Sequence, residues 1–283
     1  MPDRSPRVTV LMLTYNRPQL IGRAVASVVR QSCQDWELIV VQDGSNEHTV
    51  GVMSEWAARD GRIVYLRRDK GGNIADATNY GLARARGEYV AILDDDDAWI
   101  DEHKLARQVE FLDAHPDHAG CGGGAIVVDG AGAEQFRYRK PVSDADIRRR
   151  ALYANPMVHS TGIFRRAALE RIGRYDASLA GFQDWDVWLK LLGEGKLANF
   201  DEPLVYYTLW EGGGSFSNQR RNTESALKIV LRHRHRLPGF AGALAMATAY
   251  YLYSFLPVSV KQATYQTLSR LKKQFFAPRV SAT

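Results

Sequence analysis

Residues 71–97, GGNIADATNYGLARARGEYVAILDDDD, join a helical pattern to an apolar strand that ends in four aspartates. Ile74 to Ala85 has helical periodicity, and Gly87 stands where a helix stop is expected. Tyr89 to Leu93 is a short apolar run, typical of a buried strand, and Asp94 to Asp97 follow it directly. A helix that leads into a buried strand is half of a βαβ unit, so this stretch indicates an α/β fold.

The same alternation extends upstream. We expect strands at Val8 to Thr14, Glu37 to Gln42 and Ile63 to Leu66, with helices from Pro18 to about Gln31 and from Val50 to Arg59. Strands separated by helices predict a Rossmann-like, mostly parallel sheet flanked by helices. Further along the chain we expect helices at Lys104 to Ala114, Asp184 to Leu192 and 218–236, and strands at Gly120 to Asp129 and Leu204 to Leu209.

Polar clusters follow three of the expected strands. They are Thr14 to Arg17, Asp43 to Ser45, and Asp94 to Asp97. In open parallel sheets, ligands bind beyond the carboxyl ends of the strands. These clusters are therefore expected to meet at one edge of the sheet and to form a site.

Composition excludes several classes of protein. The 283 residues are 45% hydrophobic and 24% charged, which is typical of a globular chain. The net charge of +5 suits an anionic small substrate or an acidic membrane surface, and it is too small to indicate nucleic acid as a partner. Cys33 and Cys121 are too few for a disulfide scaffold or a four-thiolate zinc site. The first apolar run is short and lacks a small-residue cleavage site, so we expect a buried strand and a cytoplasmic location.

The acid run Asp94 to Asp97 is the most informative motif. Four adjacent carboxylates repel one another unless a cation compensates. Mg²⁺ and Mn²⁺ prefer oxygen ligands and suit a cluster that follows a strand. The alternative is a solvated acidic loop that caps the next helix.

Four blocks of the sequence, in order, resemble the family 2 inverting glycosyltransferases, which have the A-type nucleotide-sugar fold. The blocks are VTVLMLTYNRP (8–18), ELIVVQDGS (37–45), the stretch at 71–99, and GFQDWDVWLKLL (181–192). The resemblance covers about 200 residues. It implies transfer of a sugar from a nucleotide diphosphate to an acceptor hydroxyl, with help from Mn²⁺ or Mg²⁺.

The resemblance also implies roles for donor-side residues. The loop Thr14, Tyr15, Asn16 and Arg17 would hold the base and ribose, and Asp43 would accept the imide N–H of uracil or thymine. Asp94 would bind ribose, with Asp95 beside it, and Asp96 would coordinate the metal; Asp97 fits less well as a ligand. A helix start that packs under the nucleotide comprises Gly72, Asn73, Asp76, Ala77 and Asn79.

On the acceptor side, Asp184 matches the family's general base, and Gln183 takes the place of a glutamate. Asp186 lies about 200° further round the helix, so the two aspartates cannot face one substrate equally. A helix N-cap is the alternative role for Asp184. His159 is expected to line the acceptor site, and Trp185 either stacks on a sugar or belongs to the core. The resemblance implies a further histidine ligand near Trp210, which is absent here; either Glu211 supplies an oxygen ligand or the metal keeps an extra water.

The C-terminal part contains an uncharged segment followed by a basic one. No charge occurs in the 24 residues between Arg236 and Lys261, and basic and apolar residues alternate at helical spacing behind them. Residues 237–283 would lie on an anionic membrane surface, pack on the catalytic domain, or span a bilayer. The Arg-His alternation at 232–236 is expected on a solvated helix face.

The sequence therefore predicts a nucleotide-sugar-binding half (1–100), an acceptor-binding half of the same domain (101–217) and a helical extension (218–283). We expect a UDP-sugar donor first and a dTDP-sugar next, and a saccharide or lipid-linked saccharide acceptor. The expected location is the inner face of the plasma membrane. A nucleotidyltransferase and a non-catalytic nucleotide-sugar binder are the alternatives.

Overall fold

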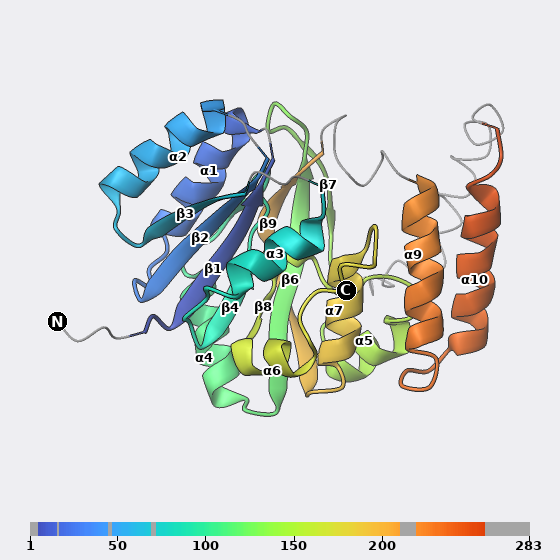
Figure 1. Ribbon diagram of the computed structural model, residues 1–283. Helices are drawn as coiled ribbons and strands as arrows, with labels where there is room; N and C mark the ends of the chain where they lie inside the picture. Colours follow the sequence, from blue (N-terminus) through green and yellow to red (C-terminus); the bar gives the residue numbers. More distant parts are fainter. Residues whose placement is uncertain (1–4, 16, 45–46, 69–71, 210–218, 258–283) are drawn as a thin grey trace.

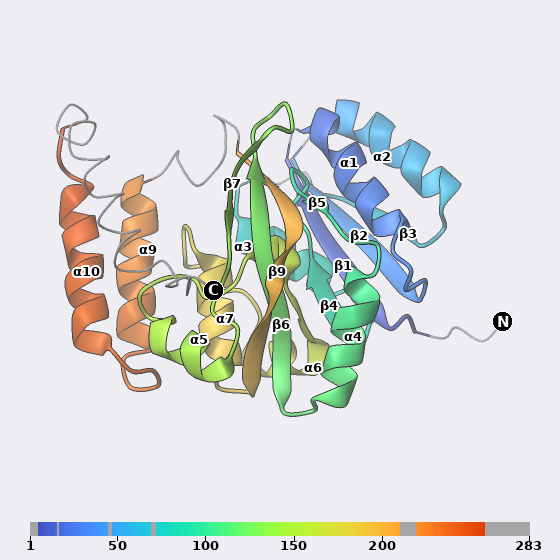
Figure 2. The same cartoon turned by 180° about the vertical axis from the view of Figure 1, so that it is seen from behind.

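One nine-stranded sheet forms the centre of the molecule, and helices cover both of its faces (Figures 1 and 2). The computed structural model describes residues 5–15, 17–44, 47–68, 72–209 and 219–257. The strand order is β3-β2-β1-β4-β8-β6-β9-β5, with β7 paired to β6. The strands are β1 (Val8–Thr14), β2 (Trp36–Asp43), β3 (Ile63–Arg68), β4 (Tyr89–Ile92), β5 (Ala98–Trp99), β6 (His118–Val128), β7 (Glu134–Tyr138), β8 (Ile163–Arg165) and β9 (Lys196–Thr208).

The first half of the sheet is parallel. β1 pairs with both β2 and β4, and β2 pairs with β3, all in the same direction. Successive side chains of β1 face opposite layers: Val10 and Met12 pack with α1 (Pro18–Val29), whereas Leu11 packs with α3 (Ile74–Leu82). A strand buried on both faces needs a continuous apolar run, which is what Val8 to Thr14 supplies.

Antiparallel pairing begins where β8 joins β4. β6 then pairs antiparallel with β8 and parallel with β9. The glycines of β6 allow close approach: a Cβ on Gly122 would lie 2.9 Å from Met157, and one on Gly123 would lie 2.7 Å from Leu204. Mixed pairing in this half brings η1 (His159–Thr161), which precedes β8, next to the end of β4.

The helices divide between two buried layers. One layer contains α1, α2 (Glu47–Arg59) and α4 (Lys104–Ala114). The other layer contains α3 and the helices of the second half, namely α5 (Asp144–Arg150), α6 (Arg166–Arg171), α7 (Gln183–Leu191) and α9 (Gln219–Arg232). α7 is thus held between the sheet and α9 (Figures 1 and 2).

The chain continues from α9 into α10 (Phe240–Tyr253), and the two helices lie side by side. Gly239 takes the left-handed conformation (φ 84°) just before α10, and Tyr153 packs closely against it. Ala243 and Ala247 bury one face of α10 in the second layer. Among the helices of the described ranges, none is both long and apolar enough to cross a membrane.

The α/β prediction is confirmed, and several bounds agree closely. The strand at 8–14 and the helix at 104–114 have the predicted ends. Not predicted were β5, β7, β8, α5 and α6, each of which is short; α10 lies within the helical extension expected at 218–283. The chain from 258 onward, with Lys261 and the expected basic segment, lies outside the described residues.

Candidate active site

The polar clusters predicted from the sequence meet at one edge of the sheet. β1, β2 and β4 run parallel, with Thr14 opposite Gln42 and Leu11 opposite Ile92. Their carboxyl ends therefore place Thr14, Asp43 and the acid run at the same edge. The convergence expected from the strand pattern is confirmed.

Three members of the acid run form a cluster of oxygens. One carboxylate oxygen each from Asp94, Asp96 and Asp97 lies within 4.8 Å of the others. Asp95 stands apart from this cluster and pairs with Arg17 at 2.6 Å. Three converging carboxylate oxygens are a donor set that fits Mg²⁺ or Mn²⁺.

Ser160 fixes the position of this cluster. Its hydroxyl donates to Asp97 Oδ2 at 2.5 Å and accepts the backbone N–H of Asp94 at 3.2 Å. The other Asp97 oxygen accepts the backbone N–H of Thr208 at 3.0 Å. Asp97 is 1% exposed and is one of the three clustered carboxylates, whereas the sequence analysis gave it a poorer fit as a ligand. The role of Ser160 was missed, although it follows His159, which had been singled out.

The acid run carries more negative charge than its surroundings compensate. Burial raises the pKa of Asp95 to about 7, although Arg17 and Thr14 oppose the shift. Burial also raises the pKa of Asp94, and burial together with the charges of Asp94 and Asp96 raises the pKa of Asp97. A cation bound among these side chains would relieve both the desolvation and the repulsion.

Arg17 contributes part of that compensation. Its Nη1 lies 2.6 Å from Asp95 and 2.7 Å from Asp96, so one guanidinium bridges two carboxylates. Arg23 supports the same turn by donating to the carbonyl of Asp96 at 2.9 Å. Tyr15 is 63% exposed, and its ring lies against Gly44. Asn16, also predicted in this loop, lies outside the described residues.

Several buried polar atoms at this edge lack a hydrogen bond. Asp43 is 8% exposed; its Oδ2 accepts the N–H of Gly72 at 3.0 Å, and its Oδ1 lies 3.7 Å from Arg68. Asp43 Oδ1, Thr14 Oγ1 and Asp95 Oδ2 have no hydrogen-bond partner within the described part of the chain. Buried polar atoms are nearly always paired, so these three mark positions where a polar ligand fits.

Two asparagines of the α3 region hold the loop that precedes α7. Asn73 caps the helix through the N–H of Ala75 at 2.9 Å and also donates to Ala177. Asn79 holds the backbone of Tyr175 with two hydrogen bonds. The side chains of Asn73 and Asn79 thus bind the loop before α7. Ala77 is buried and has no surface for a ligand, whereas Gly72 and Asp76 are exposed.

Asp184 lies in the first turn of α7, near the acid run. Its Oδ2 accepts a 2.5 Å hydrogen bond from Asn155, and its charge contributes to the raised pKa of Asp94. Phe182, at the helix start, has a left-handed backbone (φ 58°), which is unusual for a residue with a side chain. Asn155 was not predicted, because its contact with Asp184 joins distant parts of the chain.

The three predicted acceptor residues differ in exposure. His159 is half-buried; its Nε2 lies 3.4 Å from the Tyr175 hydroxyl, and its Nδ1 has no hydrogen-bond partner among the described residues. Gln183 is 8% exposed and donates to Leu179. Trp185 is 5% exposed, and its indole N–H donates to Ala151 at 2.7 Å. Gln183 and Trp185 are both packed into the core, which is the alternative that the helical spacing offered for Trp185; a role for them at the acceptor site stays a prediction.

Asp186 faces a different environment. It is fully buried and contacts Lys190 at 2.7 Å, Arg232 at 2.9 Å and His233 at 3.0 Å. Burial opposes ionisation, but the hydrogen bonds from His233 and Lys190 and the charges of Lys190 and Arg232 lower the pKa of Asp186 to about 2. The expectation of a solvated face at 232–236 is therefore wrong for His233, which is buried, whereas Arg232 remains exposed although it pairs with Asp186. Their partner, Asp186, lies more than forty residues away in sequence.

The family model described as Glycosyl transferase family 2 matches residues 9–173. The chain belongs to this family. The match spans β1 to α6 and includes the acid run, which confirms the family predicted from the sequence blocks. Glu211, the further metal ligand predicted for this glycosyltransferase, lies outside the described residues.

Of two curated relatives of this chain, one carries a glycosyltransferase name and the other is uncharacterized. An uncharacterized protein of Sinorhizobium fredii is 31% identical over 244 residues, which cover 84% of this chain but 26% of that protein. The amylovoran biosynthesis glycosyltransferase AmsE of Erwinia amylovora is 27% identical over 266 residues, which cover 91% of this chain and 97% of AmsE. The chain is therefore similar in length to AmsE and spans about a quarter of the Sinorhizobium protein.

Solved structures support the fold of the glycosyltransferase. The first 349 residues of TarS from S. aureus, in complex with UDP-GlcNAc, give a TM-score of 0.69 at 20% identity, over 95% of this chain and 77% of that one. The mannosyltransferase PcManGT of Pyrobaculum calidifontis, in complex with GDP-Man and Mn²⁺, gives 0.63 at 22% identity, over 95% and 81%. At these identities the likeness shows the A-type fold alone.

Proposed function

We propose that this glycosyltransferase moves a sugar from a nucleotide diphosphate donor to a hydroxyl of a saccharide acceptor, with inversion at the anomeric carbon. The observation that carries the proposal is the position of Asp184. Its carboxylate is near enough to Asp94 to contribute to the raised pKa of that residue. A candidate base therefore stands beside a candidate site for the leaving diphosphate.

The donor side supports a nucleotide. Asp43 Oδ1, Thr14 Oγ1 and Asp95 Oδ2 are buried acceptors or donors without hydrogen bonds to the described residues. We assign Asp43 to the imide N–H of uracil or thymine. The resemblance implies a ribose contact for Asp94, but its carboxylate belongs to the three-oxygen cluster, so we assign it to the cation. Tyr15, exposed beside Gly44, and Arg17 would complete the nucleotide site. A UDP-sugar is the first choice and a dTDP-sugar the second; the TarS complex with UDP-GlcNAc favours this order.

We assign a divalent cation, Mn²⁺ or Mg²⁺, to Asp94, Asp96 and Asp97, with Glu211 as a further candidate ligand. The three clustered oxygens and their burial support this choice. When bound, the cation would neutralise charge on the leaving diphosphate. Arg17, already paired with Asp96, would supply positive charge to the same region. The Mn²⁺ in the PcManGT complex is consistent with this assignment.

Asp184 is the proposed general base. The acceptor oxygen attacks the anomeric carbon and forms a new C–O bond while the bond to the diphosphate oxygen breaks. The acceptor proton passes to a carboxylate oxygen of Asp184. Asn155 holds Oδ2 by its hydrogen bond and thereby orients the carboxylate. Fixing both substrates in line would supply much of the remaining acceleration.

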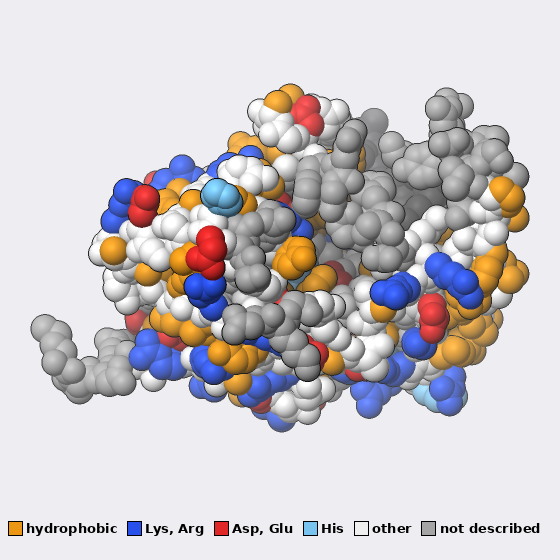
Figure 3. Space-filling view, turned by 45° about the horizontal axis from the view of Figure 1, so that its top comes forward, with side chains coloured by type: hydrophobic (Ala, Val, Ile, Leu, Met, Phe, Trp, Pro, Cys, Tyr) orange, Lys and Arg blue, Asp and Glu red, His pale blue; other side chains and the backbone are white. Residues whose placement is uncertain are grey.

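We further propose that residues 218–283 bring the enzyme to an anionic membrane surface, where a lipid-linked acceptor would be found. Leu252, Phe255 and Leu256 are 61%, 50% and 41% exposed. Hydrophobic side chains gather over α10, and Lys and Arg side chains lie beside them on α9 (Figure 3). Apolar and basic surfaces side by side favour interfacial binding. The cytoplasmic face of the plasma membrane is the location that we propose. In this scheme residues 1–100 bind the donor and 101–217 the acceptor.

A donor screen tests the proposal. Purified protein is incubated with single nucleotide sugars and Mn²⁺ or Mg²⁺, and released nucleoside diphosphate is measured for the wild type, Asp96→Ala and Asp201→Ala. We expect metal-dependent release from one donor, lost in Asp96→Ala. Asp201 is exposed and pairs only with Arg139 among the described residues, so its variant should retain activity. Release of pyrophosphate would instead identify a nucleotidyltransferase, and absence of any donor binding by calorimetry would overturn the proposal.

A further inference from the structure

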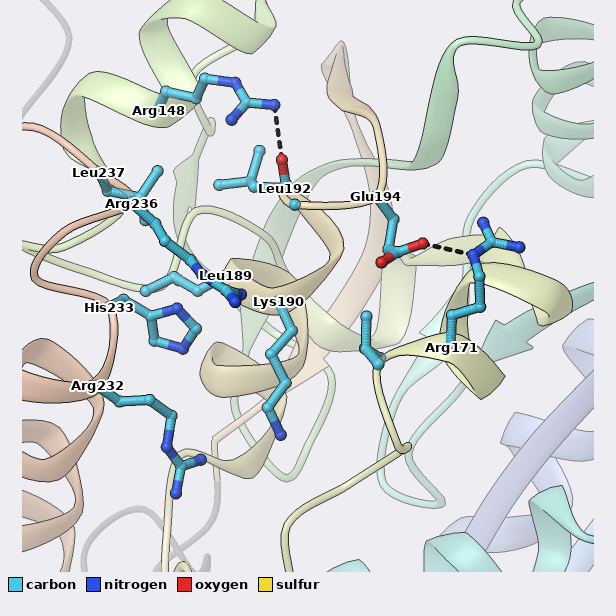
Figure 4. A pocket seen from close by; sticks show the side chains of 12 residues that line it. Arg148, Arg171, Leu189, Lys190, Leu192, Glu194, Arg232, His233, Arg236 and Leu237 are labelled. Atoms are coloured by element: carbon cyan, nitrogen blue, oxygen red, sulfur yellow. Dashed lines mark hydrogen bonds and ion pairs between the residues drawn. The ribbon is translucent and has the colours of Figure 1, made fainter.

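A hollow of about 770 Å³ opens at the C-terminal end of α7 (Figure 4). Its walls come from α5, α6, α7 and the end of α9. The helix rises about 1.5 Å per residue, so this end of α7 lies about 10 Å from Asp184. No residue assigned above to donor, metal or base lines it. The basic lining residues are Arg148, Arg171, Lys190, Arg232 and Arg236.

The positive charge of this hollow exceeds the negative charge that pairs with it. Four of the five cations have acidic partners. The fifth, Arg236, is exposed and makes no ion pair or side-chain hydrogen bond with the described residues. Its Nη1 lies 3.8 Å from where a Cβ on Gly193 would stand, so the guanidinium is directed across the hollow to α7. The acidic partners are Asp144 for Arg148, Glu194 for Arg171, Asp186 for Lys190 and Arg232, and Asp176 for Arg232.

His233 supplies a second unmatched group in the wall. Its side chain is 1% exposed, and its Nε2 lies 3.0 Å from Asp186. A ring nitrogen next to a carboxylate carries the proton, so Nδ1 is the free nitrogen. Nδ1 is buried and has no hydrogen-bond partner among the residues that the structure describes. In this tautomer Nδ1 accepts a hydrogen bond, so its partner would be a hydroxyl or a water molecule and not a diphosphate oxygen.

Aliphatic side chains make up part of the lining, beside Gly193, Glu194 and His233. They are Ile172, which is partly exposed, and the edges of Leu189, Leu192 and Leu237, which are 1–6% exposed. Guanidinium groups match the oxygens of a phosphate, and aliphatic side chains match a hydrocarbon chain. A ligand that uses both surfaces must carry an anionic group and an apolar group together.

We propose that this hollow binds the diphosphate group of an amphiphilic ester, with Arg236 and Arg171 on the anion and the aliphatic side chains on the first carbons of the chain. A lipid-linked saccharide is such a molecule. Naming it as the acceptor rests on the function proposed above, whereas the anion site rests on the hollow alone. The site would hold the lipid end of the acceptor away from the reacting hydroxyl.

Calorimetry with two soluble probes tests the site. Geranyl diphosphate and inorganic pyrophosphate are titrated in EDTA into the wild type, Arg236→Gln and Arg234→Gln. Arg234 is exposed nearby, bonds only to the carbonyl of Leu231 among the described residues, and does not line the hollow. We expect geranyl diphosphate to bind more tightly than pyrophosphate, and Arg236→Gln to weaken it about tenfold, or about 1.4 kcal/mol. Arg234→Gln should bind like the wild type.

Two results would overturn the proposal. Equal affinity of wild type and Arg236→Gln for geranyl diphosphate would remove the site. Equal affinity of the wild type for both probes would assign the site to a soluble phosphate and remove the amphiphile. UDP is titrated into the same variants with Mn²⁺. Loss of geranyl diphosphate binding with unchanged UDP affinity would separate this hollow from the donor site. Failure of the donor proposal would appear as missing UDP binding and would leave the geranyl result intact.

Discussion

The buried aspartates Asp186 and Asp95 have pKa values that are shifted in opposite directions. Asp186 has three basic partners, and its pKa falls to about 2. Asp95, although paired with Arg17, lies in a run whose charges exceed their compensation, and its pKa rises to about 7. A carboxylate whose charge is neutralised by basic partners links the elements that carry those partners. A carboxylate without enough positive charge around it is unfavourable when ionised, and a bound cation can relieve this repulsion.

α7 carries one aspartate toward the acid run and another toward α9. Asp184, in its first turn, faces the acid run, and Asp186, two residues on, faces α9. The angular separation of about 200° predicted this division. Replacing each aspartate by asparagine therefore compares the two environments with nearly the same change in volume.

The largest effect is expected for Asp184→Asn. An amide cannot take the acceptor proton, so turnover should fall by about 10²- to 10⁴-fold. The hydrogen bond from Asn155 can be kept by the amide oxygen, so the melting temperature and donor affinity should stay close to those of the wild type. Single-turnover kinetics with a matched acceptor and calorimetry with the donor measure the two quantities. Full activity would show that the base lies elsewhere. The helix-cap alternative would not account for Asp184, because Phe182 holds the N-cap position and Asp184 lies within the first turn.

Asp186→Asn should affect stability instead. Removing the charge leaves Lys190 and Arg232 without their buried partner, so we expect a loss of about 3 kcal/mol in the free energy of unfolding. Urea denaturation measures this loss, with the exposed Asp201→Asn as the control.

The dependence of stability on pH gives a second test of the contacts that Asp186 makes between α7 and α9. The pKa of Asp186 is about 2 in the fold and about 3.9 in the unfolded chain. Its contribution is therefore complete above about pH 4 and is lost as the pH falls toward 2. The difference in stability between wild type and Asp186→Asn should shrink over that range. A constant difference would mean that packing, and not charge, holds α9 to α7.

The parts of the site that lie on single strands could be predicted from sequence. The apolar run Val8 to Thr14 and the acids after β4 depend on local pattern and on the geometry of parallel pairing. Ser160 could not be predicted as a partner of Asp97, because η1 reaches the end of β4 only through the antiparallel pairing of β8.

The same limit explains the errors at the surface of α9. A run of alternating arginine and histidine is polar by composition, so it predicts exposure. His233 is nevertheless buried, because Asp186 on another helix supplies a partner for its Nε2. Trp185 is a residue for which one of the two expectations agrees with the structure. Its aromatic ring could stack on a sugar, but its indole N–H donates to the carbonyl of Ala151 in the core. Its spacing along α7 had favoured the core position.

The smallest effect that we predict sharpens the comparison at the acid run. Burial raises the pKa values of the clustered Asp94 and Asp97, so the fold favours their protonated forms, and this stabilisation is lost as the pH rises through their pKa values in the fold. A cation binds the deprotonated form and offsets this loss. Mn²⁺ at ten times the Kd measured at pH 8 should add about 1.4 kcal/mol, or about 2–3 °C in melting temperature, and the same Mn²⁺ concentration should add less at pH 6. Thermal unfolding of wild type and Asp96→Ala at both pH values measures the shift. An equal shift at both pH values, or one that persists in Asp96→Ala, would place the cation elsewhere and would leave the acid run a strained but unliganded loop.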